Sequence, residues 1–219
     1  LLHGFLENLS MWNDYAAELS TRNRVVCIDL LGHGKSDCYG YMHTMEDMAA
    51  GVKAVLNSLK LRRCIVIGHS MGGYVALAFA DLFPDNVLGL GLFYSTAKDD
   101  SDERKELRLR VIDVAKEHTK TYLKTSVQNL FYVDSLTKYP EAVEAVFTEA
   151  QKMKVQGIVA ALAGMRERPN REALLQFGPY KVLVINGRRD GLIPIESMQE
   201  QMKAARVTHT LITENGHMG

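Results

Sequence analysis

The sequence predicts an α/β protein with a mostly parallel central sheet that helices cover on both faces. Two observations favour this fold class. Short, almost wholly apolar runs are typical of strands buried in a parallel sheet. Segments with apolar residues at helical spacing lie between the first three of these runs. The strands are expected at 24–30, 63–67, 87–94, 181–186 and 207–213.

Helices are expected between the first three strands. In 45–59 the apolar side chains fall on one helix face, and 70–82 is a second helical segment that follows the bend after the run 63–67. Right-handed crossovers place the carboxyl ends of parallel strands at one edge of the sheet, where ligands bind in such folds. Ser70 falls at that edge.

The alternation of strands and helices stops between about residues 97 and 175. This block is too long to be a loop, so it must pack as a unit. We expect a core of residues 1–96 and 176–219, with residues 97–175 inserted as a helical cap over the sheet edge. Helical spacing within the cap is found at 103–117, 140–154 and 155–166.

The bulk composition is that of one sizeable domain, with 219 residues, of which 47% are hydrophobic. Lys+Arg and Asp+Glu both number 26, so no charge excess indicates nucleic acid or an anionic membrane as a partner. The most apolar runs are too short to span a bilayer. The first residues lack the basic start and long apolar core of a signal peptide.

The three cysteines are Cys27, Cys38 and Cys64. Their odd number and irregular spacing argue against a disulfide framework and favour reduced thiols in the cytoplasm. The chain has neither a CxxC pair nor an HExxH sequence, so no metal ligand set is recognised and no cofactor is expected.

The run Gly68-His69-Ser70-Met71-Gly72 joins an expected strand to an expected helix. A G-x-S-x-G turn of this kind exposes a serine hydroxyl above the sheet, and its glycines permit the strained, closely approached backbone. Ser70 is therefore the candidate nucleophile. The alternative is an ordinary turn serine, which the strand before it and the helix after it disfavour.

A serine nucleophile needs a base, a group that orients the base, and donors for the oxyanion. In this motif class the acid and the base follow the serine in the order Asp, His at the ends of later strands. Asp190 follows the run 181–186, and His217 follows the last expected strand. The expected oxyanion donors are the backbone N–H groups of Met71 and Phe5.

Other residues compete for these roles. Asp-Gly is a common turn pair, so Asp190 has a structural alternative, and Asp99 and Asp100 are rival acids at the start of the cap. His69 lies inside the turn and is expected to pack. Only His217 follows the last strand. The remaining histidines are expected in local hydrogen bonds (His3, His33) or at surface and strand positions (His43, His118, His209).

With these motifs the chain resembles the capped, esterase-like serine hydrolases of the α/β-hydrolase fold. The resemblance implies a small-molecule ester or acyl substrate, a cap that shapes its pocket, and a bracing role for Asp29 outside the site. Members normally have strands before the first motif and a helix after the histidine, so it also implies a chain trimmed at both termini. The motifs are HGF at 3–5, DLLGHGKSD at 29–37, GHSMGG at 68–73, GRRDGLIP at 187–194 and NGHM at 215–218.

Ester hydrolysis is the favoured activity, and two alternatives stay open. The menaquinone-pathway lyase of this fold uses the triad as a base and arginines for carboxylates, which the cluster Arg166, Arg168 and Arg171 could supply. That lyase has arginine where this chain has Tyr74, and a solvated helix end is the favoured interpretation of the cluster. A binding module with an idle triad is the second alternative. Serine in the turn disfavours dehalogenases and epoxide hydrolases.

Overall fold

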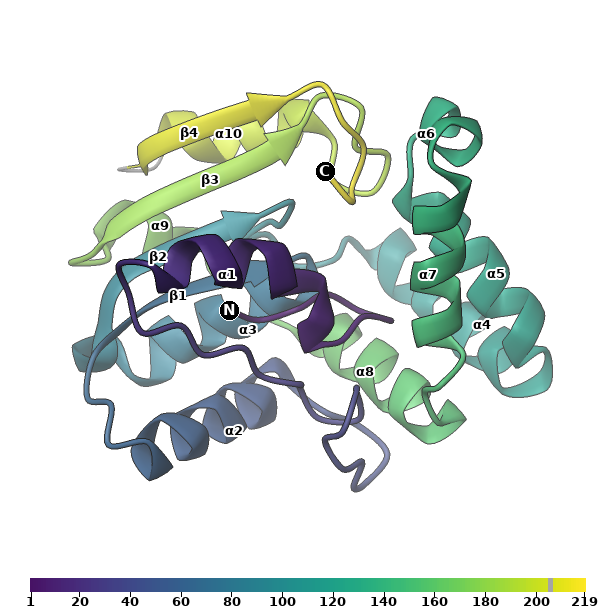
Figure 1. The fold of residues 1–219 in the computed structure, drawn as a ribbon, viewed down its shortest axis with the longest axis horizontal. Coiled ribbons are helices and arrows are strands. Elements are labelled where there is room, and N and C mark those ends of the chain that lie inside the picture. The colour runs from purple at the N-terminus through teal and green to yellow at the C-terminus, as the bar shows by residue number, and fades with distance from the viewer. Residues whose placement is uncertain (205–206) are drawn as a thin grey trace.

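The computed structural model describes residues 1–204 and 207–219, and Figure 1 shows how its elements are arranged. Four parallel strands form one sheet in the order β1-β2-β3-β4. All of them were expected from the apolar runs, and their bounds agree closely. The strands are β1 (Cys64–His69), β2 (Val87–Phe93), β3 (Lys181–Gly187) and β4 (Val207–Thr213).

The sheet is flanked by helices that the apolar spacing predicted only in part. The side chain of Thr44 accepts the N–H of Asp47, and the Asp47 carboxylate accepts the N–H of Thr44, so a capping box fixes the start of α2. The flanking helices are α1 (Asn13–Ser20), α2 (Met45–Ser58), α3 (Met71–Leu82) and α10 (Ile195–Ala204), with 3-10 turns at Leu9–Trp12 and Pro84–Asn86.

A run of helices separates β2 from β3, as the loss of alternation predicted. In Figure 1, α4 to α7 lie on the side toward which the strand arrows point. We call α4 to α8, residues 102–167, the helical insert. Its helices are α4 (Asp102–Glu117), α5 (Thr119–Leu130), α6 (Val133–Lys138), α7 (Pro140–Ala150) and α8 (Val155–Glu167), and α9 (Glu172–Phe177) follows before β3.

The two sheet faces are covered unequally. Val66, Leu90 and Val184 belong to the large core cluster that also contains the buried side chains of α2 and α3. On the other face a smaller cluster forms around Trp12 and Phe93. Helices therefore lie over both faces, and the α3 side is the more fully packed.

The strand expected at 24–30 is not formed, so this expectation was wrong. The segment forms only an isolated bridge between Ile28 and Leu2. Leu2 also bridges Gly68, so it lies between the segment and β1. The chain turns at Phe5 and Leu6, shortly after Leu2, so few residues are available there for a ladder. Within the described residues, no helix is both long and apolar enough to cross a lipid bilayer.

Candidate active site

Ser70 occupies a strained position between β1 and α3. Its φ of 48° and ψ of −114° lie outside the regions that non-glycine residues prefer. Hydrogen bonds hold this backbone: the Ser70 N–H donates to the Phe93 carbonyl at 3.0 Å, and the Ser95 hydroxyl donates to the Ser70 carbonyl at 2.7 Å. The turn therefore raises the Ser70 side chain at the carboxyl edge of the sheet.

The glycines on either side of Ser70 have a steric reason. A Cβ on Gly68 would clash with the backbone of Gly72, and a Cβ on Gly72 would clash with the carbonyl groups of Leu2 and His3. The turn thus packs directly against the first residues of the chain. Only glycine permits both close approaches.

The structure brings Ser70, His217 and Asp190 together. Nε2 of His217 lies 2.8 Å from Oγ of Ser70, and Nδ1 of His217 lies 2.8 Å from Oδ2 of Asp190. His217 and Asp190 are 1% and 5% exposed. The other carboxylate oxygen, Oδ1 of Asp190, accepts the N–H groups of Leu192 and Ile193 at 2.9 Å each. This series aligns a hydroxyl, an imidazole and a carboxylate for proton transfer.

The rival acids lie elsewhere. Asp100 is buried and binds the guanidinium groups of Arg108 and Arg168. Asp99 accepts a hydrogen bond from the Asn170 side chain at 3.3 Å. Both carboxylates are thus engaged within the connections to the helical insert, and Asp190 is the acid that contacts His217.

The two expected oxyanion donors reach the serine in different ways: Met71 follows Ser70 in the sequence, and Phe5 belongs to the first residues of the chain, which pack against the turn. Met71 is the first residue of α3, so its N–H points out of a helix N-terminus, where the helix dipole favours negative charge. Phe5 follows the His3-Gly4 segment that packs on the turn. Within the described residues, neither N–H donates to another protein group, and both are free to bind a ligand oxygen.

His3 and His33 form local hydrogen bonds, as expected. His3 donates from Nδ1 to the Gly4 carbonyl at 2.7 Å and accepts the Leu30 N–H at Nε2, which requires a neutral ring. His33 donates from Nδ1 to the Leu31 carbonyl. Burial, aided by the nearby His3, lowers the pKa of His33 from 6.5 to about 3. These histidines support the loops below the serine.

One histidine expectation needs correction, and another is incomplete. His43 is fully buried rather than at the surface, because α8 packs on it and the His43 N–H donates to the Ala160 carbonyl. His69 does more than pack: its ring is hydrogen-bonded on one side to Glu7 and on the other to the backbone carbonyl of His217. Sequence reasoning missed Glu7. Its only signal was a carboxylate in a largely apolar stretch.

The interpretation of the arginine cluster as a solvated helix end was also wrong, because Arg168 and Arg171 are buried. Arg168 binds Asp100 and stacks 4.0 Å above the Tyr74 ring. Arg171 pairs with Glu46 and Asp81. Internal carboxylates therefore pair the charges of Arg168 and Arg171, although Nε of Arg168 has no hydrogen-bond partner among the described residues. Arg166 pairs instead with its exposed neighbour Glu167.

Two further features border the site. Asp29 braces loops, as the resemblance implied, by accepting the N–H groups of Leu9 and Lys35. A cavity of about 490 Å³ lies between the loop 29–38 and the end of α7, and Glu7 lines it. Ser70 and His217 are not among the residues that line this cavity, so the cavity lies beside the group formed by Ser70, His217 and Asp190.

Comparison with known proteins places the chain in a family. The family model described as the alpha/beta hydrolase fold matches residues 1–219. The chain belongs to this family. A thermophilic esterase from Thermogutta terrifontis superposes with a TM-score of 0.93 and 32% identity, covering 99% of this chain and 81% of that one. Fold and family are therefore shown, and the α/β-hydrolase resemblance is confirmed.

Curated relatives cover a range of activities. The chain is 27% identical over its whole length to a dihydrolipoyllysine-residue acetyltransferase component of an acetoin cleaving system from Pseudomonas putida. A Bacillus subtilis protein named as a 2-succinyl-6-hydroxy-2,4-cyclohexadiene-1-carboxylate synthase is 33% identical over 97 residues, 43% of this chain and 35% of that protein. The chain spans 26% of the length of the first mycobacterial relatives and 58% of the P. putida protein.

Proposed function

We propose that this α/β hydrolase is a serine hydrolase that cleaves a carboxylic ester or a related acyl bond of a small molecule. The observation that supports it best is the 2.8 Å contact between Nε2 of His217 and Oγ of Ser70, extended by Asp190. The likeness to an esterase at 32% identity supports the same activity.

In the proposed mechanism, Oγ of Ser70 attacks the carbonyl carbon of the ester while Nε2 of His217 takes the hydroxyl proton. The carbonyl oxygen becomes an oxyanion, which the N–H groups of Phe5 and Met71 stabilise. Loss of either donor costs about 10²–10³ in rate in comparable sites. His217 then passes the proton to the departing alcohol, and the acyl group stays on Ser70.

Water completes the cycle by the same route. His217 takes a proton from water, the hydroxide attacks the acyl carbon, and the proton returns to Oγ as the carboxylic acid leaves. Asp190 keeps Nδ1 protonated throughout, so that Nε2 presents its lone pair whenever it must take a proton from the serine or from water. We also propose that the helical insert, as the cap of the core, lines the acyl and alcohol pockets and sets substrate choice.

The lyase alternative is weaker. Its carboxylate-binding role would need free guanidinium groups, but Arg168 and Arg171 are committed to Asp100, Glu46 and Asp81. Of the cluster this leaves only Arg166, which pairs with the adjacent Glu167. The resemblance to the Bacillus subtilis synthase extends over only 43% of this chain. This alternative and the binding module are therefore treated as outcomes of the test.

A fluorophosphonate probe and a panel of p-nitrophenyl esters from acetate to octanoate test the proposal. Labelling and ester turnover are expected for the unmodified protein and not for Ser70→Ala, with a strong reduction for His217→Ala. Ser58→Ala is the matched control, since Ser58 is exposed at the end of α2 and should change neither signal.

Two results would contradict ester hydrolysis. A folded protein that the probe does not label would favour a binding module. Labelling without turnover of any ester, together with elimination from the lyase substrate, would favour the lyase.

A further inference from the structure

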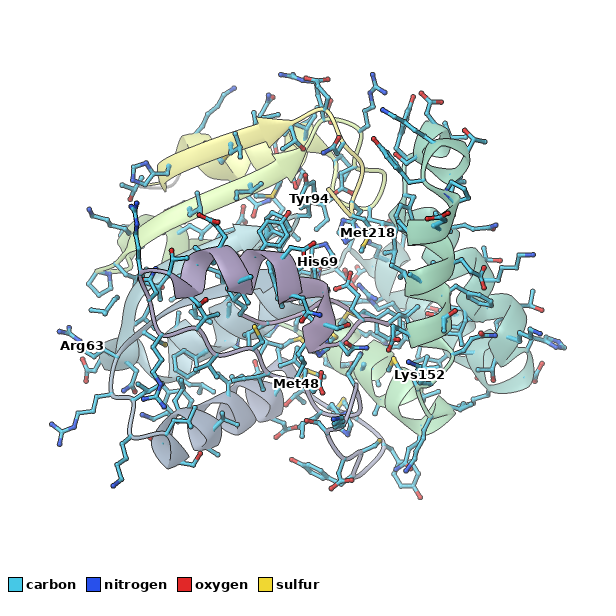
Figure 2. All side chains as sticks on the ribbon, in the orientation of Figure 1. Met48, Arg63, His69, Tyr94, Lys152 and Met218 are labelled. Carbon is cyan, nitrogen blue, oxygen red and sulfur yellow. The ribbon has the colours of Figure 1, made fainter. Side chains whose placement is uncertain are left out.

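His69 is the last residue of β1 and directly precedes the proposed nucleophile, yet its ring is hydrogen-bonded to other groups. Figure 2 shows it among the side chains near Tyr94 and Met218. Nδ1 of His69 lies 2.9 Å from Oε2 of Glu7, and Nε2 lies 2.9 Å from the backbone carbonyl oxygen of His217. Both ring nitrogens therefore face oxygen atoms.

These contacts require a charged pair. A carbonyl oxygen only accepts, so Nε2 of His69 carries a proton, and a carboxylate oxygen at Nδ1 calls for a second one. The side chains of His69 and Glu7 are 1% and 3% exposed. Burial by itself lowers the pKa of His69, but the charge and hydrogen bond of Glu7 outweigh it, so the pKa is raised above 6.5. The ring is thus an imidazolium paired with a carboxylate.

The pair also connects parts of the site that are far apart in sequence. Oε2 of Glu7 accepts the Gly4 N–H at 2.5 Å, in the segment that carries the proposed donor Phe5. Through His69 the same oxygen is linked to the turn of Ser70, and onward to the loop of His217. One buried carboxylate therefore holds together the proposed oxyanion loop, nucleophile and base.

We propose that the Glu7–His69 ion pair is a positioning device that sets the His217 imidazole on Ser70 by holding the backbone carbonyl of His217. The proposal rests on the catalytic roles proposed above. Asp190 fixes the orientation of the His217 ring, whereas His69 fixes the location of the backbone that carries it. A displacement of about 1 Å in such a group lowers rates about 10²-fold.

The geometry of Glu7 permits a clean test of charge. Both hydrogen bonds fall on Oε2, and Oε1 is buried without a partner among the described residues. Glutamine fits the same space with its oxygen at Oε2 and its amide nitrogen at Oε1. Glu7→Gln therefore preserves the shape and the acceptor at Oε2 and removes the charge that His69 needs. It also places an amide NH₂ at the unpartnered Oε1 position, and the double variant described below carries the same amide as a control.

The experiment compares His69→Leu, His69→Gln, Glu7→Gln and the double variant Glu7→Gln/His69→Leu in p-nitrophenyl butyrate turnover. We expect His69→Leu to lower kcat about 10–100-fold with KM within twofold, since the proposed role of the ring is to hold the His217 carbonyl and not to touch the substrate. His69→Gln keeps an N–H donor for the His217 carbonyl and should restore much of kcat. His209→Gln, an exposed change on β4, is the control and should leave kcat unaltered.

The double variant separates pairing from general damage. Glu7→Gln should lower kcat in the unmodified protein. In the His69→Leu background the carboxylate has already lost its cation, so adding Glu7→Gln should leave kcat unchanged or raise it. Equal losses in both backgrounds, a change confined to KM, or an unchanged kcat in His69→Leu would overturn the inference. Thermal unfolding identifies temperatures at which every variant is folded.

A spectroscopic readout keeps the inference distinct from the proposed function. The Nδ1 proton shared by His217 and Asp190 should give a low-field NMR resonance in the unmodified protein and in His69→Gln, and lose it in His69→Leu. A protein that turns over no ester would end the proposed function, and this resonance would still decide whether His69 positions His217. Retention of the resonance in His69→Leu would refute the positioning role.

Discussion

Oδ2 of Asp190 lies 2.8 Å from Nδ1 of His217, while Oδ1 of the same carboxylate accepts two backbone N–H groups of the loop after β3. The second set of bonds holds the carboxylate still, so its free oxygen meets the imidazole in one orientation. The ring then carries its proton on Nδ1 and presents a lone pair at Nε2, which is the form that a base for Ser70 must have.

Asp190→Asn should therefore lower kcat by about 10⁴-fold and change KM little. The amide has nearly the same shape, but its NH₂ group facing Nδ1 favours the opposite tautomer, with the proton on Nε2 facing the serine. Steady-state kinetics on a p-nitrophenyl ester measures the loss, and circular dichroism checks the fold. Activity within tenfold of the unmodified protein would show that Asp190 does not orient the base.

The sharp turn at Ser70 gives a prediction about stability. A methyl group on Gly72 would overlap the carbonyl groups of Leu2 and His3, so Gly72→Ala should lower the free energy of unfolding by about 1–3 kcal/mol or more. Gly51→Ala is the matched control, because Gly51 lies within α2 and a Cβ there meets no atom within 4 Å.

The control should have the opposite sign, with Gly51→Ala raising the free energy of unfolding by about 0.5–1 kcal/mol through helix propensity. Urea denaturation followed by circular dichroism measures both changes. If the two alanine variants shift in the same direction, close packing does not explain the glycine at position 72.

Much of the fold could be predicted because its signals are local. The four strands of the sheet are apolar runs, and the turn at Ser70 is defined by two glycines with only three residues between them. The segment 24–30 carried the same apolar signal but formed only one bridge. A strand needs a neighbour of matching length, and a run of hydrophobic residues does not reveal whether one is present.

The missed features depend on partners that are distant in sequence. Glu7 meets His69 across 62 residues, and Asp100 meets Arg168 across 68. A charged residue in the sequence is by default a surface residue, because burial of a charge is favourable only with a partner. One sequence without structure gives no sign of which partner is reached, so Arg168 and Arg171 were assigned to the solvent.

The buried contact of Asp100 with Arg108 and Arg168 connects the two ends of the helical insert. Arg168 also donates to the Lys98 and Met165 carbonyls, so it joins the chain that leaves β2 to the chain that returns. Asp100→Asn should lower the free energy of unfolding by about 3–5 kcal/mol, because Arg108 and Arg168 lose their counter-charge, as does the more distant and more exposed Arg104.

Asp113→Asn is the control for this change. Asp113 pairs with Lys116 on the exposed surface of α4, so its loss should cost less than about 1 kcal/mol. Chemical denaturation of both variants measures the difference. A comparable small loss for both would mean that the Asp100 contact contributes no more than a surface ion pair.

The buried ring of His33 predicts that acid weakens the fold. Its pKa falls from 6.5 to about 3 on folding, because burial and the neighbouring His3 disfavour the charged ring. Between these values the unfolded chain binds a proton that the folded chain does not, so the free energy of unfolding falls as the pH is lowered. From pH 7 to pH 5 this one group should remove roughly 2 kcal/mol.

His33→Phe tests this dependence, because phenylalanine keeps a ring against Phe5 and has no proton to bind. The unmodified protein should lose roughly 2 kcal/mol more than the variant between pH 7 and pH 5 in urea denaturation. Between pH 7 and pH 8 the two proteins should change in parallel, since His33 is then neutral whether folded or unfolded, and this range is the internal control. Parallel curves down to pH 5 would show that the folded protein accommodates the charged ring, and that burial of His33 does not make the fold sensitive to acid.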